Sequence, residues 1–173
     1  LERVTEALNE GKTARSLEYT EEEAEIMLTV PLLTMKPVIY VANISEDEIG
    51  SDMSGNAGYV KLAARAAEEG AGILPICAQI EAEIAVLEPD EKAVFLEDLG
   101  LAESGLDRLI KASYSLLGLI SFLTAGPQEV RAWTITRGTR APQAAGKIHS
   151  DFERGFIRAE IIAFDKLMEC GSM

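Results

Sequence analysis

Two short apolar runs, separated by one amphipathic segment, place the strongest constraint on the fold of this chain. Residues 38–42 and 73–77 are apolar throughout, and a helix is expected between them from about residue 58 to residue 69. Uninterrupted apolar strands are typical of parallel sheets that are covered on both faces. A strand, a helix and a second strand within about 40 residues form a βαβ unit. The sequence therefore predicts an α/β layer with a parallel sheet.

Further elements are expected on both sides of this unit. A helix within 1–10 stops at Gly11, and Thr20 with Glu23 predicts a capping box for a helix that ends before Pro31. Later helices are predicted near 79–87, 90–99 with Asp90 as N-cap, and 104–118. The tail predicts strands at 120–124 and 130–135 with a turn at Gly126 and Pro127, a short helix at 142–150, and a third strand at 156–164.

Charge divides the chain into two unlike parts. The 173 residues carry a net charge of −13, which argues against coating of nucleic acid or anionic membrane by bulk charge. Residues 1–119 hold 9 basic and 23 acidic side chains, whereas residues 120–173 hold 7 basic and 6 acidic ones. This break predicts a domain boundary near 119–120.

The remaining composition predicts a cytoplasmic protein. Two cysteines, Cys77 and Cys170, are too few for a disulfide framework, and no run approaches the roughly 18 apolar residues of a membrane helix. The chain opens at Leu1 inside a helical pattern and stops at Met173 without a tail. We therefore expect it to be a fragment of a longer protein, with no membrane association.

Polar residues follow both predicted strands at the same edge of the sheet. Asn43 and Glu46 come after the first strand, and Cys77 and Ala78 end the second. Because ligands of parallel sheets bind beyond the carboxyl ends of the strands, this edge is a candidate site, and a carboxamide suits a purine edge. The alternative is local: Asn43 caps a turn, and Glu46 lies in a first turn capped by Ser45 with Glu48. Spacing leaves both interpretations open.

The motifs at this edge resemble a known enzyme family. Asn43-x-x-Glu46 after an apolar strand is similar to the base-specificity motif of P-loop GTPases, usually Asn-Lys-x-Asp. The runs KPVIYVAN at 36–43 and CAQIE at 77–81 resemble the YchF/Obg-like ATPase family. So do TAG at 124–126, EVRAWTI at 129–135 and APQAAGKIHSDFERGFIRA at 141–159, which are similar to the family's TGS domain. The resemblance covers nearly the whole chain.

The resemblance implies an architecture in three parts. Residues 1–30 would be the end of a helical (coiled-coil) insertion, and 31–119 the C-terminal half of a P-loop nucleotide-binding domain. Residues 120–173 would be a small α+β TGS domain, β-grasp-like and truncated. The fold class expected is α/β, half of a P-loop NTPase with a parallel sheet, followed by that domain.

The resemblance also implies ATP binding in preference to GTP. Asn43 and the backbone at Ile44 are expected to hold adenine, with Cys77, Ala78 and Gln79 closing over the base. Ile44 stands where guanine-specific relatives have Lys, and Glu46 is one methylene longer than Asp, which disturbs a guanine clamp. An unpaired polar group against the wrong base costs about 1–3 kcal/mol. Glu46 is expected to orient the loop more than to touch the ligand.

The phosphate-binding half of such a site is absent from this sequence. No Gly-x-x-x-x-Gly-Lys-Ser/Thr run occurs in the 173 residues. The resemblance therefore implies that the intact protein hydrolyses ATP with Mg²⁺ held by other residues, and that this chain alone is inactive. We expect no catalytic residue and no metal ligand here: His149 is a lone histidine, and Cys77 is favoured as a base-loop residue over a nucleophile.

The tail concentrates basic residues that could contact a ribosome or RNA. Ordinary solvated surface is the alternative for each one. Because the family is ribosome-associated, they are predicted to form a phosphate-contacting face, and the runner-up function is a TGS-mediated ribosome or RNA adaptor without catalysis. The candidate residues are Arg131, Arg137, Lys147, Arg154 and Arg158.

Overall fold

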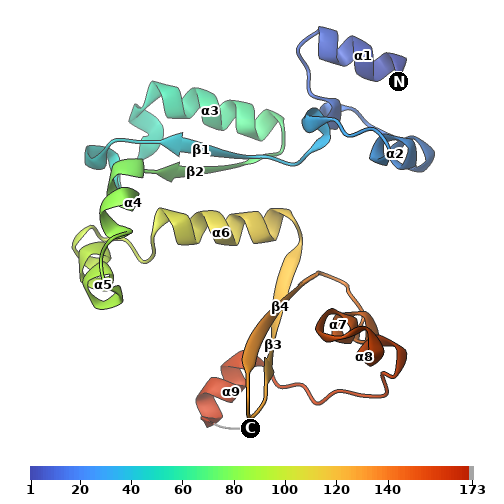
Figure 1. The fold of residues 1–173 in the computed structure, drawn as a ribbon. Helices are drawn as coiled ribbons and strands as arrows, with labels where there is room; N and C mark the ends of the chain where they lie inside the picture. The colour runs from blue at the N-terminus through green and yellow to red at the C-terminus, as the bar shows by residue number, and fades with distance from the viewer. Residues whose placement is uncertain (172–173) are drawn as a thin grey trace. The chain divides into compact units, whose positions relative to one another are not determined.

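The computed structural model describes residues 1–171, and the chain divides into two compact units, 1–117 and 118–173 (Figure 1). None of the helices in the described part is long and apolar enough to cross a membrane. The assignment of residues 1–30, 31–119 and 120–173 to three functional parts stays a prediction.

The first unit contains the predicted βαβ unit. Strand β1 (Ile39–Asn43) pairs in parallel with β2 (Gly72–Ile76), in a register that places Asn43 opposite Ile76. Helix α3 (Ala57–Glu68) connects the strands and contacts both of them (Figure 1). It begins where the Asn56 side chain accepts a hydrogen bond from the Tyr59 N–H at 2.9 Å. The parallel sheet and its helices confirm the α/β prediction.

Three helices follow the second strand. They are α4 (Ala78–Ile84), α5 (Pro89–Asp98) and α6 (Gly105–Leu116), of which α6 contacts β2. Their core contains Cys77, Ile80, Ile84 and Leu96. The prediction that Asp90 caps α5 is wrong, because the N-cap is Glu88. Proline favours the first helical position, where its fixed φ fits and no N–H is needed, so the helix begins at Pro89.

The N-terminal segment has a small core of its own. Val4, Ala14 and Met27 form it. The segment comprises α1 (Glu2–Asn9), η1 (Ala14–Ser16), α2 (Glu21–Leu28) and η2 (Leu33–Met35). The capping box of α2 is confirmed: Thr20 Oγ1 accepts from the Glu23 N–H at 3.3 Å, and Glu23 accepts from the Thr20 N–H at 3.0 Å.

The second unit is a two-stranded antiparallel sheet with three helices in its described part. Strand β3 (Leu119–Ala125) pairs with β4 (Val130–Thr136), and Gly126 N–H donates to Glu129 O at 3.0 Å in the turn. The helices are α7 (Ala141–Ile148), α8 (Ser150–Arg154) and α9 (Phe164–Cys170). The single helix predicted at 142–150 is interrupted, because His149 has extended backbone between α7 and α8.

The third strand predicted at 156–164 is wrong. Residues 156–163 form no regular element, and α9 begins at Phe164. The side chains of Ile157 and Ile161 are 90% and 84% exposed, so the apolar run has no buried face. A short apolar run does not specify a strand by periodicity alone, since a strand also needs a neighbouring strand to bond. That this unit is a TGS domain stays a prediction.

Candidate functional site

The ends of β1 and β2 are joined by a side chain. Because the strands are parallel and Asn43 is opposite Ile76, the residues that follow each strand meet at one edge. Asn43 Oδ1 accepts a hydrogen bond from the backbone N–H of Ala78, the first residue of α4, at 3.1 Å. The carbonyl oxygen is thereby engaged, so Nδ2 is the group of this exposed side chain that offers hydrogens to a ligand.

Ile44 continues the sheet beyond Asn43. Its N–H donates to Ile76 O at 3.0 Å, and its half-buried side chain packs against the core that contains Cys77 and Ile80. Sequence reasoning expected the backbone at Ile44 to hold a base. The structure commits its N–H to the sheet, which leaves the carbonyl oxygen as the backbone group for that role.

Glu46 is exposed, at the start of the short helix η3 (Glu46–Glu48). The local capping that the alternative interpretation required is present beside it, because the Ser45 N–H and hydroxyl each donate to Glu48 Oε2 at 3.0 Å. The backbone N–H of Ser45 first, and then the Asn56 and Ser45 side chains, lower the pKa of Glu48 below its usual range. The loop after Asn43 is therefore held by Glu48, whereas Glu46 faces solvent.

The three predicted residues after β2 differ in accessibility. The Cys77 side chain is only 7% exposed and lies in the core with Ile80 and Ile84. Ala78 and Gln79 are exposed, and Gln79 Nε2 donates to Glu83 Oε1 at 3.4 Å. Ala78 and Gln79, at the start of α4, are therefore accessible to a ligand, whereas the Cys77 side chain is packed in the core.

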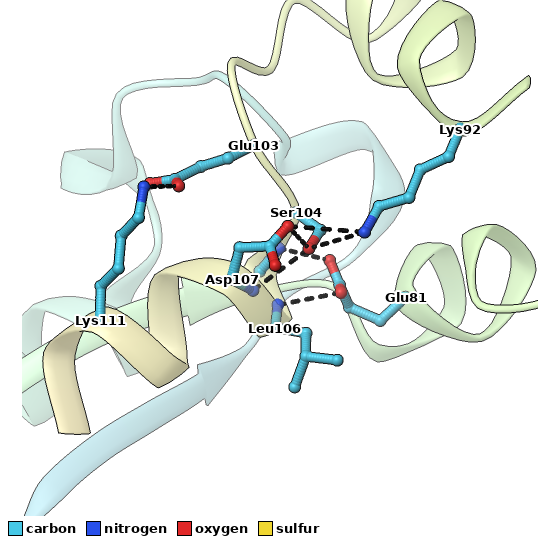
Figure 2. A network of polar contacts seen from close by, with 8 residues as sticks. Glu81, Lys92, Glu103, Ser104, Leu106, Asp107 and Lys111 are labelled. Atoms are coloured by element: carbon cyan, nitrogen blue, oxygen red, sulfur yellow. Dashed lines mark hydrogen bonds and ion pairs between the residues drawn. The ribbon is translucent and has the colours of Figure 1, made fainter. Parts of the chain in front are cut away.

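A polar network behind the loop was missed by sequence reasoning. Figure 2 shows the Glu81 carboxylate directed at the start of α6, where it accepts from the backbone N–H groups of Gly105 and Leu106 at 2.7 and 3.0 Å. Ser104 Oγ caps the same helix by accepting from the Asp107 N–H at 3.2 Å. The spacing of Ser104 and Asp107 signals a helix start in sequence, but nothing in it signals a partner 24 residues away.

The nearby ionisable groups of this network stabilise one another. Ser104 Oγ donates to Asp107 Oδ2 at 2.6 Å, and Lys92 Nζ lies 3.5 Å from that same carboxylate oxygen (Figure 2). The Ser104 hydroxyl first, and then Lys92, lower the pKa of Asp107 below its ordinary value. Lys111 and Glu103 form a further ion pair beside the network. The first turn of α6 is therefore held by hydrogen bonds and ion pairs from charged side chains.

A cavity of about 220 Å³ lies beside the site, between the η3 loop and α6. Its lining includes Ile44, Ile49, Ile76, Ile80, Glu81 and Arg108, but neither Asn43 nor Ala78. Arg108 Nη1 donates to Pro75 O at 3.3 Å. Ile44 and Cys77, the neighbours of Asn43 and Ala78, also line it, so the cavity adjoins the edge that Asn43 and Ala78 form.

The described residues contain no preformed cluster of metal ligands. In the part of the chain that the structure describes, no group of three or more His, Cys, Asp or Glu side chains could hold a metal. His149 Nδ1 accepts from the Asp151 N–H at 3.2 Å and caps α8. His149 therefore has a structural role at the corner between α7 and α8.

The five basic candidates of the second unit are all exposed. Arg131 lies on β4 with its guanidinium 4.4 Å from the centre of the Trp133 ring, a cation–π contact. Trp133 Nε1 donates in turn to Thr124 Oγ1 at 2.9 Å. The others are Arg137 after β4, Lys147 on α7, Arg154 at the end of α8 and Arg158 beyond it. Helix α7 contacts both β4 and α8, so these elements form one small assembly.

Comparison with known proteins matches the chain over its whole length. A family model named YchF-GTPase_C, described as "Protein of unknown function (DUF933)", matches residues 119–173. The "Ribosome-binding ATPase YchF" of Bacillus subtilis (strain 168) is 56% identical over 173 residues, which is 100% of this chain and 47% of that protein. The "Obg-like ATPase 1" of Oryza sativa subsp. indica is 42% identical over 172 residues, 99% of this chain and 43% of that protein.

A solved structure agrees with these relatives. The Schizosaccharomyces pombe YchF GTPase matches with a TM-score of 0.80 and 34% sequence identity, covering 97% of this chain and 44% of that one. The chain spans about half the length of the curated relatives it matches. The family resemblance predicted from the motifs is confirmed: the chain belongs to the YchF family.

Proposed function

We propose that this chain supplies the base-binding part of a purine-nucleotide site in an ATP-hydrolysing, ribosome-associated protein. The observation that carries the proposal is the hydrogen bond from the Ala78 N–H to Asn43 Oδ1, which joins the ends of two adjacent parallel strands. Ligands of open parallel sheets bind at such an edge. The names of the relatives, "Ribosome-binding ATPase YchF" and "Obg-like ATPase 1", support the same class of protein.

The donors and acceptors at this edge suit a purine. Asn43 offers its Nδ2 hydrogens, because its oxygen is engaged by Ala78. A donor of this kind matches N7, an acceptor that adenine and guanine share, so Asn43 alone binds either base. The exposed Ala78 and Gln79 supply the neighbouring wall.

Preference for ATP would come from the group that faces position 6 of the purine. Adenine has an amino donor there, whereas guanine has an oxygen acceptor. The Ile44 N–H is committed to Ile76, so the backbone group that Ile44 can present is a carbonyl oxygen. A carbonyl accepts from adenine and leaves guanine unpaired, at a cost of about 1–3 kcal/mol. Ile44 also lacks the charged ammonium group that Lys would bring to this position.

Hydrolysis needs groups that this chain does not contain. Phosphoryl transfer depends on a phosphate-binding loop and on Mg²⁺, which neutralises charge on the transferring group. The sequence has no such loop, and the described residues contain no cluster of three or more metal-ligating side chains. In the proposed enzyme these residues therefore bind and orient the base, and other parts of the intact protein handle the phosphates.

Titration of the intact protein with ATP and GTP tests the proposal. We expect tighter binding of ATP, and we expect Asn43→Ala to weaken ATP binding by about 1–3 kcal/mol, the range for a lost hydrogen bond in a desolvated site. Asn9→Ala, an exposed change at the end of α1, is the matched control and should leave affinity unchanged. Unchanged ATP affinity in Asn43→Ala would refute the proposed base site.

A second candidate function is adaptor binding to the ribosome through the second unit. It is favoured by the five exposed cations in a part of the chain whose charge is slightly positive. Ribosomal RNA would be contacted through its phosphates. A protein that binds ribosomes normally but does not bind ATP would favour this adaptor over the enzyme.

A further inference from the structure

The side chain of Glu81 connects two helices that are distant in the sequence. Its two carboxylate oxygens accept from the N–H groups of Gly105 and Leu106, the first two residues of α6 (Figure 2). These N–H groups have no acceptor inside their own helix, and the positive end of the helix dipole attracts the carboxylate. Glu81 therefore anchors α4 to α6 through two charge-assisted hydrogen bonds.

The residue at position 105 is fitted to this contact. A Cβ added to Gly105 would lie 2.8 Å from Glu81 Oε1 and 2.8 Å from Ile76 Cγ2, nearer than real side-chain carbons approach. Only a glycine lets the carboxylate reach the backbone here. The contact is therefore supported by the space around Gly105 as well as by the hydrogen-bond geometry.

Glu81 lies one helical turn from the base-binding loop, by which we mean Cys77, Ala78 and Gln79 at the junction of β2 and α4. Its N–H donates to Cys77 O at 3.0 Å, and this turn contains Ala78, whose N–H is bonded to Asn43. A continuous set of hydrogen bonds therefore runs from the start of α6 through Glu81 and Ala78 to Asn43. Loss of the Glu81 carboxylate would break the connection of α4 to α6.

We propose that Glu81 is a positioning residue for the base-binding loop. Its carboxylate holds the first turn of α4 in the orientation in which Ala78 and Gln79 receive the purine, and Glu81 itself does not touch the nucleotide. The proposal rests on the proposed function, since it assigns Glu81 to the same site. It extends that function by naming α6 as the support of the loop.

The test uses the intact protein and fluorescently labelled ADP. Glu81→Ala is expected to raise the Kd of labelled ADP about tenfold. A tenfold change in Kd corresponds to about 1.4 kcal/mol, which is close to the net contribution of one hydrogen bond. Glu81→Gln keeps one acceptor and should show a smaller rise. The kcat at saturating ATP should stay unchanged, because the loss is one of binding. Hydrogen exchange in a peptide spanning 77–84 should accelerate in both variants.

Gly105→Ala provides the same displacement without changing Glu81, and it carries the test if Glu81→Ala does not fold. Ser104→Ala is the matched control, because it removes the N-cap of α6 but leaves the bonds from Glu81 to α6 in place. It should lower Tm without raising the Kd of labelled ADP. Equal Kd rises in Ser104→Ala and Glu81→Ala would overturn the positioning role.

Failure of this proposal is distinguishable from failure of the proposed function. If Asn43→Ala raises the Kd and the Glu81 and Gly105 variants do not, the positioning role is overturned while the base site stands. If Asn43→Ala also leaves the Kd unchanged, the base site itself is refuted and the role of Glu81 is refuted with it.

Discussion

Asn43 Oδ1 accepts the backbone N–H of Ala78 at 3.1 Å, so one side chain joins the ends of both strands of the parallel sheet. The bond separates the two functions of a carboxamide. Its oxygen holds the loop after β2, and its nitrogen remains for a ligand. Structure and binding at Asn43 can therefore be tested with different substitutions.

Asn43→Asp should weaken nucleotide binding without loosening the loop. An aspartate retains an oxygen that can accept from Ala78, but it has no hydrogens to donate to a purine N7. We expect ATP affinity of the intact protein to fall by about 1–3 kcal/mol, measured by calorimetric titration. The Tm in the absence of nucleotide should fall less than in Asn43→Ala. Equal affinity in wild type and Asn43→Asp would mean that Nδ2 does not face the base.

Glu69 connects the N-terminal segment to the α/β layer. Its buried carboxylate, with a side chain 7% exposed, forms an ion pair with Arg15, accepts from Tyr40 Oη at 2.9 Å and pairs with Arg65 at 2.7 Å. Glu69→Gln should lower Tm, because Arg15 would lose its carboxylate partner in a largely buried position. Glu68→Gln, which alters an exposed neighbour on α3, is the control and should change Tm little.

The same carboxylate predicts a pH dependence of stability. The hydrogen bond from Arg15 first, and then that from Tyr40, lower the pKa of Glu69 from its ordinary value of 4.5. A lowered folded-state pKa means that the stabilisation is complete above the unfolded value and is lost as pH falls through the folded one. Thermal melts between pH 7 and about pH 3 should therefore show a steeper loss of Tm below pH 4.5 in wild type than in Glu69→Gln. Parallel curves would contradict this.

The two cysteines should differ sharply in reactivity. Cys77 is buried in the core, whereas Cys170 is exposed on α9. A thiol needs access to the reagent as well as ionisation in order to react. Under native conditions maleimide labelling followed by peptide mass spectrometry should modify Cys170 within minutes and Cys77 only after unfolding. Rapid native labelling of Cys77 would show that the loop around Ala78 opens readily.

Sequence reasoning succeeded where local chemistry decides the structure. The apolar runs that contain Val41 and Leu74 predicted paired parallel strands, and Thr20 with Glu23 predicted a capping box that is present. It failed where a distant partner decides. Residues 156–163 have the apolar content of a strand but no strand to bond. The N-cap of α5 was misassigned for a local reason, because Pro89 takes the first helical position and leaves Glu88 as the N-cap in place of Asp90.

The candidate site shows the same division. The sequence placed Asn43 and Ala78 at one edge, because parallel strands bring their ends together. It could not show that the Cys77 side chain faces the core, because a small side chain that follows a strand can point either to solvent or to the core. The role of Glu81 could not be predicted either. Its carboxylate oxygens accept from backbone N–H groups, which every residue except proline has, so the sequence does not identify the partner.

The basic residues of the second unit predict salt-dependent binding to ribosomes. Neutralising Arg131, Lys147 and Arg154 together with glutamine should weaken co-sedimentation of the intact protein. Each phosphate contact contributes about 0.7–0.9 to the slope of log affinity against log salt concentration, so the slope should fall by roughly 2 to 3. Arg131 also contacts Trp133, and a single Trp133→Leu variant, which removes the ring and keeps the charge of Arg131, separates that cation–π contact from phosphate binding. Lys61→Gln, an exposed change on α3 in the first unit, is the control. Binding that is insensitive to both salt and the triple change would show that these cations are ordinary solvated surface and that the ribosome is contacted elsewhere.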